Sequence, residues 1–340
     1  MRCVARRLLP SLSALGAALL VNGIIILAAG HSPWLALTAV VDGAFGSVDS
    51  WSEVAVKGCP LLLTGLAIAV SFQAGVWNIG AEGQLLIGAL AMAALGTHGA
   101  ALPAWVVLTV DLTAAALCGA LWAGIAAELK LRRNVNEVIS TIMLNFIALA
   151  LISYLVQGPL MESGGRYPQS DTILATAWLP RLAPPLRVHL GVLIALVAAA
   201  ALQILLYRTV AGYEMRAAGA NAQAARLAGI DVRHRLRLAL MLSGALAGLA
   251  GAIEVSAVTR RLYEHFSPGW GFTAIAVGLL GRLSPAGVVL AACFFGALDA
   301  GSNSMQRVAG VSSVLVSVIQ ATVILFLVTF ERSEWLRRDT

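Results

Sequence analysis

The sequence has little charge and few cysteines, and it lacks the short motifs of common hydrolases. Charged side chains make up only 12% of its 340 residues. None of the four cysteines belongs to a CxxC pair, the spacing of zinc and redox sites. No GxxxxGKS/T, HExxH or GxSxG motif occurs, and the five histidines show no metal-ligand spacing. We therefore expect no ATP hydrolysis, no catalytic residue, no metal site and no resident cofactor in this chain.

What the chain has is apolar sequence in long runs. Apolar side chains make up 59% of the residues, and the mean hydropathy of +0.85 indicates an integral membrane protein. Runs of roughly 20 residues predict spanning helices rather than barrel strands. We expect an all-α, polytopic helix bundle that forms one transmembrane domain over residues 1–340. Its ten predicted spans are 8–29, 55–74, 84–97, 103–127, 137–157, 188–207, 237–258, 271–281, 286–303 and 311–330.

Two of these spans, 84–97 and 271–281, are short. At 1.5 Å per residue, 271–281 cannot cross about 30 Å of hydrocarbon, so a broken or re-entrant helix is expected there. The arginine-rich start followed by an apolar run is also compatible with a signal peptide. Because the run of about 22 residues exceeds the 7 to 15 of a signal core, we predict an uncleaved first span.

The basic residues are distributed unevenly among the connecting segments. With the amino terminus inside, the predicted cytoplasmic segments hold most of the 23 Lys and Arg residues, whereas the outer loop 30–54 holds none. This asymmetry predicts that both termini are cytoplasmic. The net charge of +6 is explained by the lipids of the inner leaflet, so no nucleic-acid partner is expected.

Two of the predicted loops are long. The outer loop 158–187 is rich in Pro, Gly and polar residues, and it is either a cap or contact on the outer face or a plain solvated connector. The inner loop 208–236 alternates small residues and Arg at helical spacing, with Gly219 and Gly229 as breaks. It predicts one or two short helices under the membrane, whose small residues let another protein approach closely.

The stretch "GVWNIGAEGQLLIGAL" at 75–90 carries Asn78, Glu82 and Gln84 among four glycines. Unpaired polar groups in a bilayer cost several kcal/mol, so such a segment must lie against protein or a watery cavity. Asn78 and Glu82, four residues apart, are predicted to share one helical face. A second glycine-rich, interrupted stretch lies at 267–288, and paired broken segments point to a transporter's central pathway.

Further polar and aromatic residues stand within or next to apolar runs. Each polar residue either forms a hydrogen bond between two helices or lines a polar solute pathway, and the sequence supports both interpretations equally. The aromatic Trp77, Phe72 and Phe146 either stack on a flat ligand or pack in the bundle. Glu137 is interpreted as a helix cap. The residues predicted to line a substrate pathway are Trp77, Asn78, Glu82, Gln84, Asn136, Asn145, Glu254 and Phe272.

Four stretches together carry a family resemblance. In chain order they are "WNIGAEGQLLIGA" (77–89), "NEVISTIMLNFIA" (136–148), "AAGANAQAARLAGI" (217–230) and "SPGWGFTAIAVGLLGRLSPAGV" (267–288). From about residue 55 onward the chain resembles the permease subunits of bacterial ATP-binding-cassette (ABC) importers for nucleosides and simple sugars, a family related to branched-chain amino acid and ribose permeases. One departure is Trp77, where Phe is expected.

The resemblance implies a multi-pass protein of the bacterial plasma membrane that works with three partners. These are a second permease subunit, identical or related, a cytosolic ATP-binding subunit that binds the ATP, and an external solute-binding lipoprotein. It also implies that 213–230 is a coupling helix that inserts into the ATPase. The coupling residues implied are Glu214, Gly219, Asn221, Ala225, Arg226 and Gly229.

Three alternatives for the transported solute and the energy source stay open. Asn and Gln bind sugar hydroxyls as readily as a nucleoside, so simple sugars or branched-chain amino acids are rival substrates to nucleosides. An ion-coupled secondary transporter is the remaining class, with Glu254 and Asp299 as its candidate carboxylates.

Overall fold

The computed structural model describes residue 16, residues 20–98 and 102–312, and the single residues 315, 318, 319, 321, 322 and 325. Within these residues every regular element is a helix, accompanied by two isolated β-bridges. The predicted all-α class is therefore confirmed. Most of the predicted first and last spans, 8–29 and 311–330, and both predicted cytoplasmic termini lie outside the described residues.

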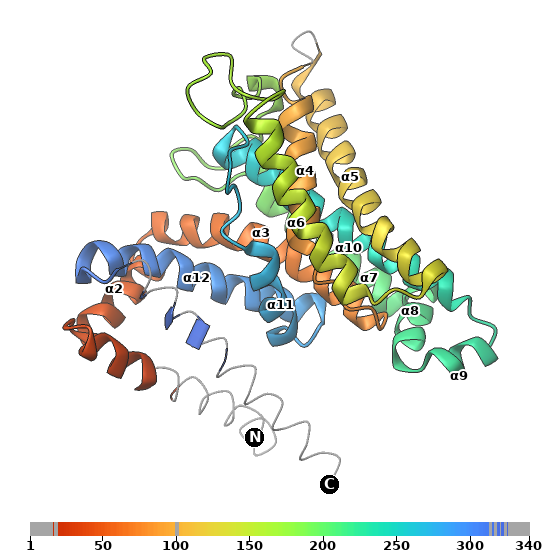
Figure 1. Cartoon of the computed structure of the whole chain (residues 1–340). Helices are drawn as coiled ribbons and strands as arrows, with labels where there is room; N and C mark the ends of the chain where they lie inside the picture. Colours follow the sequence, from red (N-terminus) through yellow and green to blue (C-terminus); the bar gives the residue numbers. More distant parts are fainter. Residues whose placement is uncertain are drawn as a thin grey trace. The chain divides into compact units, whose positions relative to one another are not determined.

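The longest connections between the helices lie on either side of η1 and between η2 and α11 (Figure 1). They are α2 (Pro33–Phe45), α3 (Val48–Gln73), α4 (Ala81–Leu95), α5 (Ala104–Arg133), α6 (Glu137–Val156), the short η1 (Ala175–Ala177), α7 (Leu190–Arg208), α8 (Val210–Ala220), α9 (Ala222–Leu227), α10 (Val232–Glu254), the π-helical η2 (Val255–Thr259), α11 (Trp270–Leu280) and α12 (Pro285–Ala309).

Six of the described helices are long and apolar enough to cross a membrane: α3, α5, α6, α7, α10 with η2, and α12. A helix over Leu20–Ala28 and α2 together also pass this test, but they are bent by 118°. As the sequence predicts, α4 and α11 are short, with 15 and 11 residues. The structure thus supports a multi-pass membrane protein, while the count of ten spans stays a prediction.

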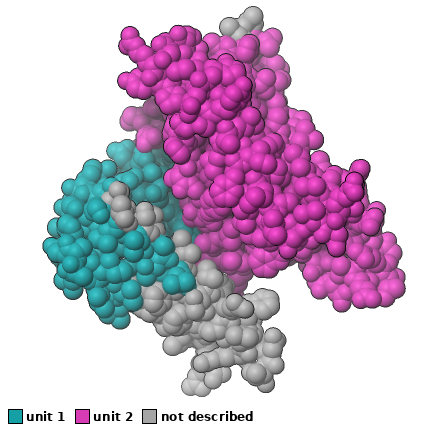
Figure 2. Space-filling view, viewed as in Figure 1, with its two compact units in different colours: residues 1–58, 293–340 teal, residues 59–292 magenta. Residues whose placement is uncertain are grey.

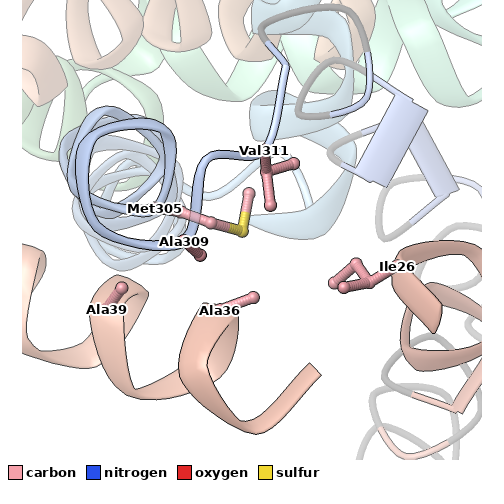
Figure 3. Packing of buried hydrophobic residues seen from close by; sticks show 6 residues of the cluster. All are labelled: Ile26, Ala36, Ala39, Met305, Ala309 and Val311. Atoms are coloured by element: carbon pink, nitrogen blue, oxygen red, sulfur yellow. The ribbon is translucent and has the colours of Figure 1, made fainter. Parts of the chain in front are cut away.

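The chain forms two compact units, residues 1–58 with 293–340 and residues 59–292 (Figure 2). In the first unit, Met305 of α12 and Val311 pack with two alanines of α2 and with Ile26 (Figure 3). Lys57 and Asp299 form an ion pair of 2.9 Å within the same unit. An added Cβ on Gly43 would lie 2.3 Å from the Cβ of Ser304, so α2 and α12 approach closely.

The second unit is built around α4, α5 and α10, whose backbones touch at glycines. A Cβ on Gly88 of α4 would lie 2.0 Å from the carbonyl oxygen of Gly248 on α10, and one on Gly244 would lie 2.3 Å from that of Gly119 on α5. Only residues without a side chain allow such approaches. These contacts hold the three helices together and position the site described below.

The long loop and the short helices of this unit lie at opposite ends of it (Figure 1). At the loop end, the N–H of Leu174 donates to the carbonyl of Gly96 over 2.7 Å. At the other end, which we call the coupling end, α8 and α9 lie near the last turn of α5, and Arg237 pairs with Glu128 over 2.5 Å. The two long loops predicted for opposite sides of the membrane are therefore separated by the length of α5, whose 30 residues extend about 45 Å.

Candidate functional site

The glycine-rich stretch 75–90 forms a break between α3 and α4. Gly75 turns the chain with a φ of +78°, and the following residues up to Gly80 are not helical. Within this break Val76 and Asn78 are fully buried. The prediction that Asn78 and Glu82 share a helical face is wrong, because Asn78 precedes the start of α4 at Ala81. The left-handed turn at Gly75 ends α3 before it can continue through Asn78.

Asn78 is the centre of a buried hydrogen-bond network. Its side-chain nitrogen donates to Oε1 of Gln84 over 2.9 Å and to the hydroxyl of Ser243 on α10 over 2.7 Å. Its side-chain oxygen accepts from the N–H of Gly80 over 2.9 Å and from Nε2 of Gln84 over 3.1 Å. Ser243 donates in turn to the carbonyl of Ala67 on α3 over 2.6 Å. The network thus ties the break to α3, α4 and α10.

Asn145 of α6 secures the same break from the other side. Its side-chain oxygen accepts from the N–H of Gly83 over 2.8 Å, and its side-chain nitrogen donates to the carbonyl of Ile79 over 2.8 Å. One turn earlier on α6, the hydroxyl of Thr141 accepts from the N–H of Ile79 over 3.3 Å. Main-chain groups of the break, which no helix satisfies, are therefore satisfied by α6.

Glu82 connects the two glycine-rich stretches. Its carboxylate accepts from the N–H of Gly271, at the start of α11, over 2.7 Å. The N-terminal end of a helix carries partial positive charge, which favours a carboxylate there. A Cβ on Gly271 would lie 2.2 Å from the main-chain nitrogen of Glu82, so only glycine fits. The paired broken segments therefore lie in direct contact.

These polar groups are engaged within the protein. Asn78, Glu82, Gln84 and Asn145 are at most 2% exposed. In this conformation their amides and carboxylate hold the backbone of the break and of α11 rather than presenting themselves to a solute. Their place in a substrate pathway stays a prediction, and the geometry described above supports a positioning role.

The other predicted pathway residues lie in different surroundings. Trp77 is 54% exposed and its ring lies 4.7 Å from that of Phe72, while Phe272 is 47% exposed. Asn136 is exposed and caps α6 by accepting the N–H of Val138 over 2.9 Å. It thus takes the capping role interpreted for Glu137, which instead pairs with Lys130 over 2.6 Å.

Glu254 is distant from the Asn78 network. It is buried at the end of α10, immediately before η2. It lies eleven residues after Ser243 on the same helix, which places the two about 16 Å apart along its axis. The structure therefore brings together four of the predicted pathway residues, Asn78, Glu82, Gln84 and Asn145, whereas Glu254 belongs to a later part of α10 than Ser243.

One face of α6 is apolar and open. Ile139, Met143, Phe146 and Tyr154 are between 49% and 68% exposed and recur at helical spacing. Trp77 lies two residues before Ile79, whose N–H and carbonyl group bond to Thr141 and Asn145 of this helix. We call these four residues with Trp77 the α6 face. It offers flat and apolar side chains but few polar groups.

The inner loop contains two short helices, as the sequence predicts. Thr209 caps α8 and Asn221 caps α9, accepting N–H groups of Gln223 and Ala224 over 3.0 Å each. Gly229, with a φ of +84°, follows α9 and is the expected break. Gly219 is not a break, because it lies inside the last turn of α8 and the chain turns at Asn221, whose backbone is extended.

Gly219 instead forms a direct contact between α8 and the α3–α4 break. An added Cβ would lie 2.1 Å from the carbonyl oxygen of Gln73 and 2.8 Å from the main-chain nitrogen of Gly75. The side chains of Glu214 and Arg235 pair, which ties α8 to α10. The backbone of α8 is thus in direct contact with the segment that leads to Asn78.

The predicted coupling residues of the α9 region differ in exposure. Ala225 is buried against Ala218 and Val232, so it anchors α9. Asn221, Arg226 and Gly229 are exposed. Leu227, which the sequence did not single out, is 86% exposed at the end of α9. Leu227 is the one large apolar side chain of α9 that is exposed, and single exposed residues of this kind are common on protein surfaces.

Known proteins match this chain along most of its length. Residues 50–328 match the family described as branched-chain amino acid transport system / permease component. The chain is 41% identical over 326 residues to a glucose ABC transporter permease protein of Haloferax volcanii, covering 93% of this chain and 85% of that protein. It is 37% identical over 324 residues to a guanosine ABC transporter permease protein of Bacillus subtilis, covering 94% and 92%. A nucleoside ABC transporter permease protein of Lactococcus lactis is 30% identical over 331 residues, covering 95% and 91%.

Proposed function

The chain belongs to the permease components of the branched-chain amino acid transport family, and on that premise we propose that it imports nucleosides through an ABC complex powered by a separate ATP-binding subunit. It is an ABC transporter permease and a multi-pass membrane protein. The nucleoside substrate is supported by two relatives, one named for guanosine and one for nucleosides. The proposed setting is a bacterial plasma membrane, with both termini in the cytoplasm and ten spans.

The contact of Gly219 with the α3–α4 break carries the proposed mechanism. In this mechanism the ATP-binding subunit contacts the exposed surface of α9 around Arg226 and Leu227. When that subunit closes on ATP, its movement passes through α8 into the break without an intervening flexible loop. The buried Asn78 network makes the break rigid enough to transmit this movement to α4 and α11.

The α6 face is the proposed lining of the solute route. Bases and sugar rings present flat or apolar surfaces, which stack on side chains such as Trp77 and Phe146. With few polar groups the face binds solute weakly, which suits a permease that receives its solute from an external binding lipoprotein. A second permease subunit, identical or related, forms the opposite wall in this proposal.

Glucose is a second candidate solute, because the glucose permease of Haloferax volcanii is 41% identical to this chain. An ion-coupled mechanism is less well supported. One of its two candidate carboxylates, Asp299, is paired with Lys57.

Uptake of radiolabelled solute by cells that express the complete transporter tests these candidates. We expect guanosine uptake that requires an intact ATP-binding subunit, is lost when this chain is deleted, and is not reduced by excess glucose. Glucose uptake that requires both the ATP-binding subunit and this chain would identify glucose, rather than a nucleoside, as the transported solute. Guanosine uptake driven by a proton gradient, in vesicles whose ATP-binding subunit is inactivated, would overturn the ABC mechanism.

A further inference from the structure

A groove lies on the surface of the second unit between α5 and α10. Its volume is about 670 Å³. Seven of its residues come from α5 and two from α10: Leu121, Gly124, Ile125, Glu128, Leu129, Arg132, Arg133, Arg237 and Met241. The volume falls in the range of roughly 300–1,000 Å³ that is usual for small-molecule sites.

The groove exists because Gly124 leaves space between two helices that touch nearby. At Gly119 and Gly244 the backbones of α5 and α10 are in direct contact. Further along α5, a Cβ added to Gly124 would meet nothing closer than Cγ of Met241 at 3.9 Å. Leu121, Ile125 and Leu129 are exposed beside this space. The part of the groove around Gly124 is therefore apolar.

The length and polarity of the groove match one leaflet of a bilayer. From Leu121 to Arg133 the groove follows α5 for twelve residues, or about 18 Å. Half of a bilayer's hydrocarbon core is about 15 Å thick. The apolar residues occupy the part toward the middle of α5, and the charged residues lie together at its coupling end, where headgroups would lie.

The charged end of the groove is positive. Three arginines, Arg132, Arg133 and Arg237, surround the single carboxylate of Glu128. The Nε atoms of Arg132 and Arg237 donate to Glu128 over 2.6 and 2.5 Å. Within the described part of the chain Arg133 has no ion-pair partner. Each guanidinium carries five N–H groups, so donors remain for a phosphate.

We propose that this groove binds an anionic glycerophospholipid of the leaflet at the coupling end. One acyl chain lies along Leu121, Ile125 and Met241, and the phosphate binds Arg133 with the remaining N–H groups of its two neighbours. The bound lipid fixes the position of α5 against α10 beside the short helices. This site is separate from the solute route and does not depend on which solute is carried.

The test is native mass spectrometry of the full chain in detergent, titrated with palmitoyl-oleoyl phosphatidylglycerol or phosphatidylcholine. We expect one tightly bound phosphatidylglycerol per chain and at least tenfold weaker binding of phosphatidylcholine. A basic residue near a membrane surface contributes enough binding that Arg133→Gln should weaken phosphatidylglycerol binding roughly fivefold. Arg133→Lys keeps the charge and should restore most of the affinity. Gly124→Leu fills the groove and should abolish binding of the single tight lipid.

Arg233→Gln is the matched control, because Arg233 is exposed near the same end of α10 but does not line the groove. Equal binding of both lipids, or equal losses in Arg133→Gln and Arg233→Gln, would overturn the proposal. Competition by sn-glycerol 3-phosphate as strong as that of the whole lipid would show a phosphate site without an acyl chain. Loss of pairing between permease chains in Gly124→Leu, seen by light scattering, would assign the groove to a second copy. An unchanged unfolding temperature shows that each variant is folded.

Discussion

The α3–α4 break and the α8–α9 segment use the same residue types in opposite surroundings. Both have glycines at points of close approach, and both have an asparagine whose side chain accepts N–H groups a few residues further on. Asn78 is fully buried, and its side-chain amide also hydrogen-bonds to the side chains of Gln84 and Ser243. Asn221 is exposed, and its side-chain oxygen accepts only the N–H groups of Gln223 and Ala224 on α9. Asn78 in the break is thus enclosed by the protein, although Trp77 beside it is exposed, whereas Asn221 at the start of α9 is open to the surface.

This difference separates the roles of the two regions. The break is a rigid part of the bundle, so changes there should act first on folding and on transmitted movement. The surface of α9 is open, so changes there should act on a partner and leave folding intact. Gly219 joins the two regions, and the following predictions, from the largest expected effect to the smallest, test whether the division is correct.

Gly219→Leu should have the largest effect on uptake. The new Cβ meets the backbone of Gln73, which cannot move aside like a flexible side chain. Overpacking of this kind costs up to about 3 kcal/mol, or roughly a hundredfold in an equilibrium constant. We expect solute uptake to fall about a hundredfold while the ATP-binding subunit still hydrolyses ATP. Ala220→Leu, at the exposed neighbouring position, is the control. Normal uptake by Gly219→Leu would contradict a rigid junction.

Asn78→Leu should destabilise the chain itself. Leucine leaves Gln84 and Ser243 buried without their partner, and each unsatisfied group costs about 1–3 kcal/mol. We expect the unfolding temperature, followed by thermal denaturation in detergent, to fall by several degrees. Asn136→Ala removes an exposed helix cap and should cost only about 1 kcal/mol. Equal losses for the two variants would mean that the network adds nothing beyond local capping.

Leu227→Glu should weaken the ATP-binding subunit's attachment without affecting folding. An exposed residue contributes within about 0.5 kcal/mol to stability, whereas a central interface residue contributes more than 1 kcal/mol to binding. We expect about tenfold weaker assembly, measured by co-purification against a titration of that subunit. Leu102→Glu is the control, since Leu102 is 51% exposed near the loop end. Similar losses in both variants would place the partner's contact elsewhere.

Trp77→Phe should have the smallest effect. Phenylalanine is the residue expected at this position from the family resemblance, and it keeps an aromatic ring next to Phe72. An aromatic pair contributes about 0.5–1.5 kcal/mol, so uptake should change by about threefold and the unfolding temperature should stay the same. Concentration-dependent uptake of guanosine measures this. A change of unfolding temperature as large as that of Asn78→Leu would move Trp77 from the α6 face into the structural core.

The sequence predicts what depends on local pattern. Long apolar runs give the helices, the short run at 271–281 gives the short α11, and the spacing of small residues and arginines gives α8 and α9. Thr141 is not among the predicted site residues, although its position one turn before Asn145 places both side chains on the same face of α6.

Long-range partners are not readable in the same way. Ser243 lies 165 positions from Asn78, and nothing in its surroundings distinguishes it from other small residues on α10. Likewise, Gly219 looks like a helix break in sequence because glycine disfavours helices, and only its approach to Gln73 shows why glycine is needed inside α8. The roles of Ser243 and Gly219 depend on contacts with segments far away in the sequence. Such contacts exist only in the folded chain.

The backbone contacts among α4, α5 and α10 limit how the gate of this transporter can work. At Gly88, Gly119 and Gly251 the backbones of α4, α5 and α10 are in direct contact. No flexible side chains lie between them at these points that could rearrange to let one helix shift past another. A switch between inward and outward openings must therefore move these three helices together as one block. The motion has to be taken up by elements outside this block, which are the first places to look for displacement when a second conformation is determined.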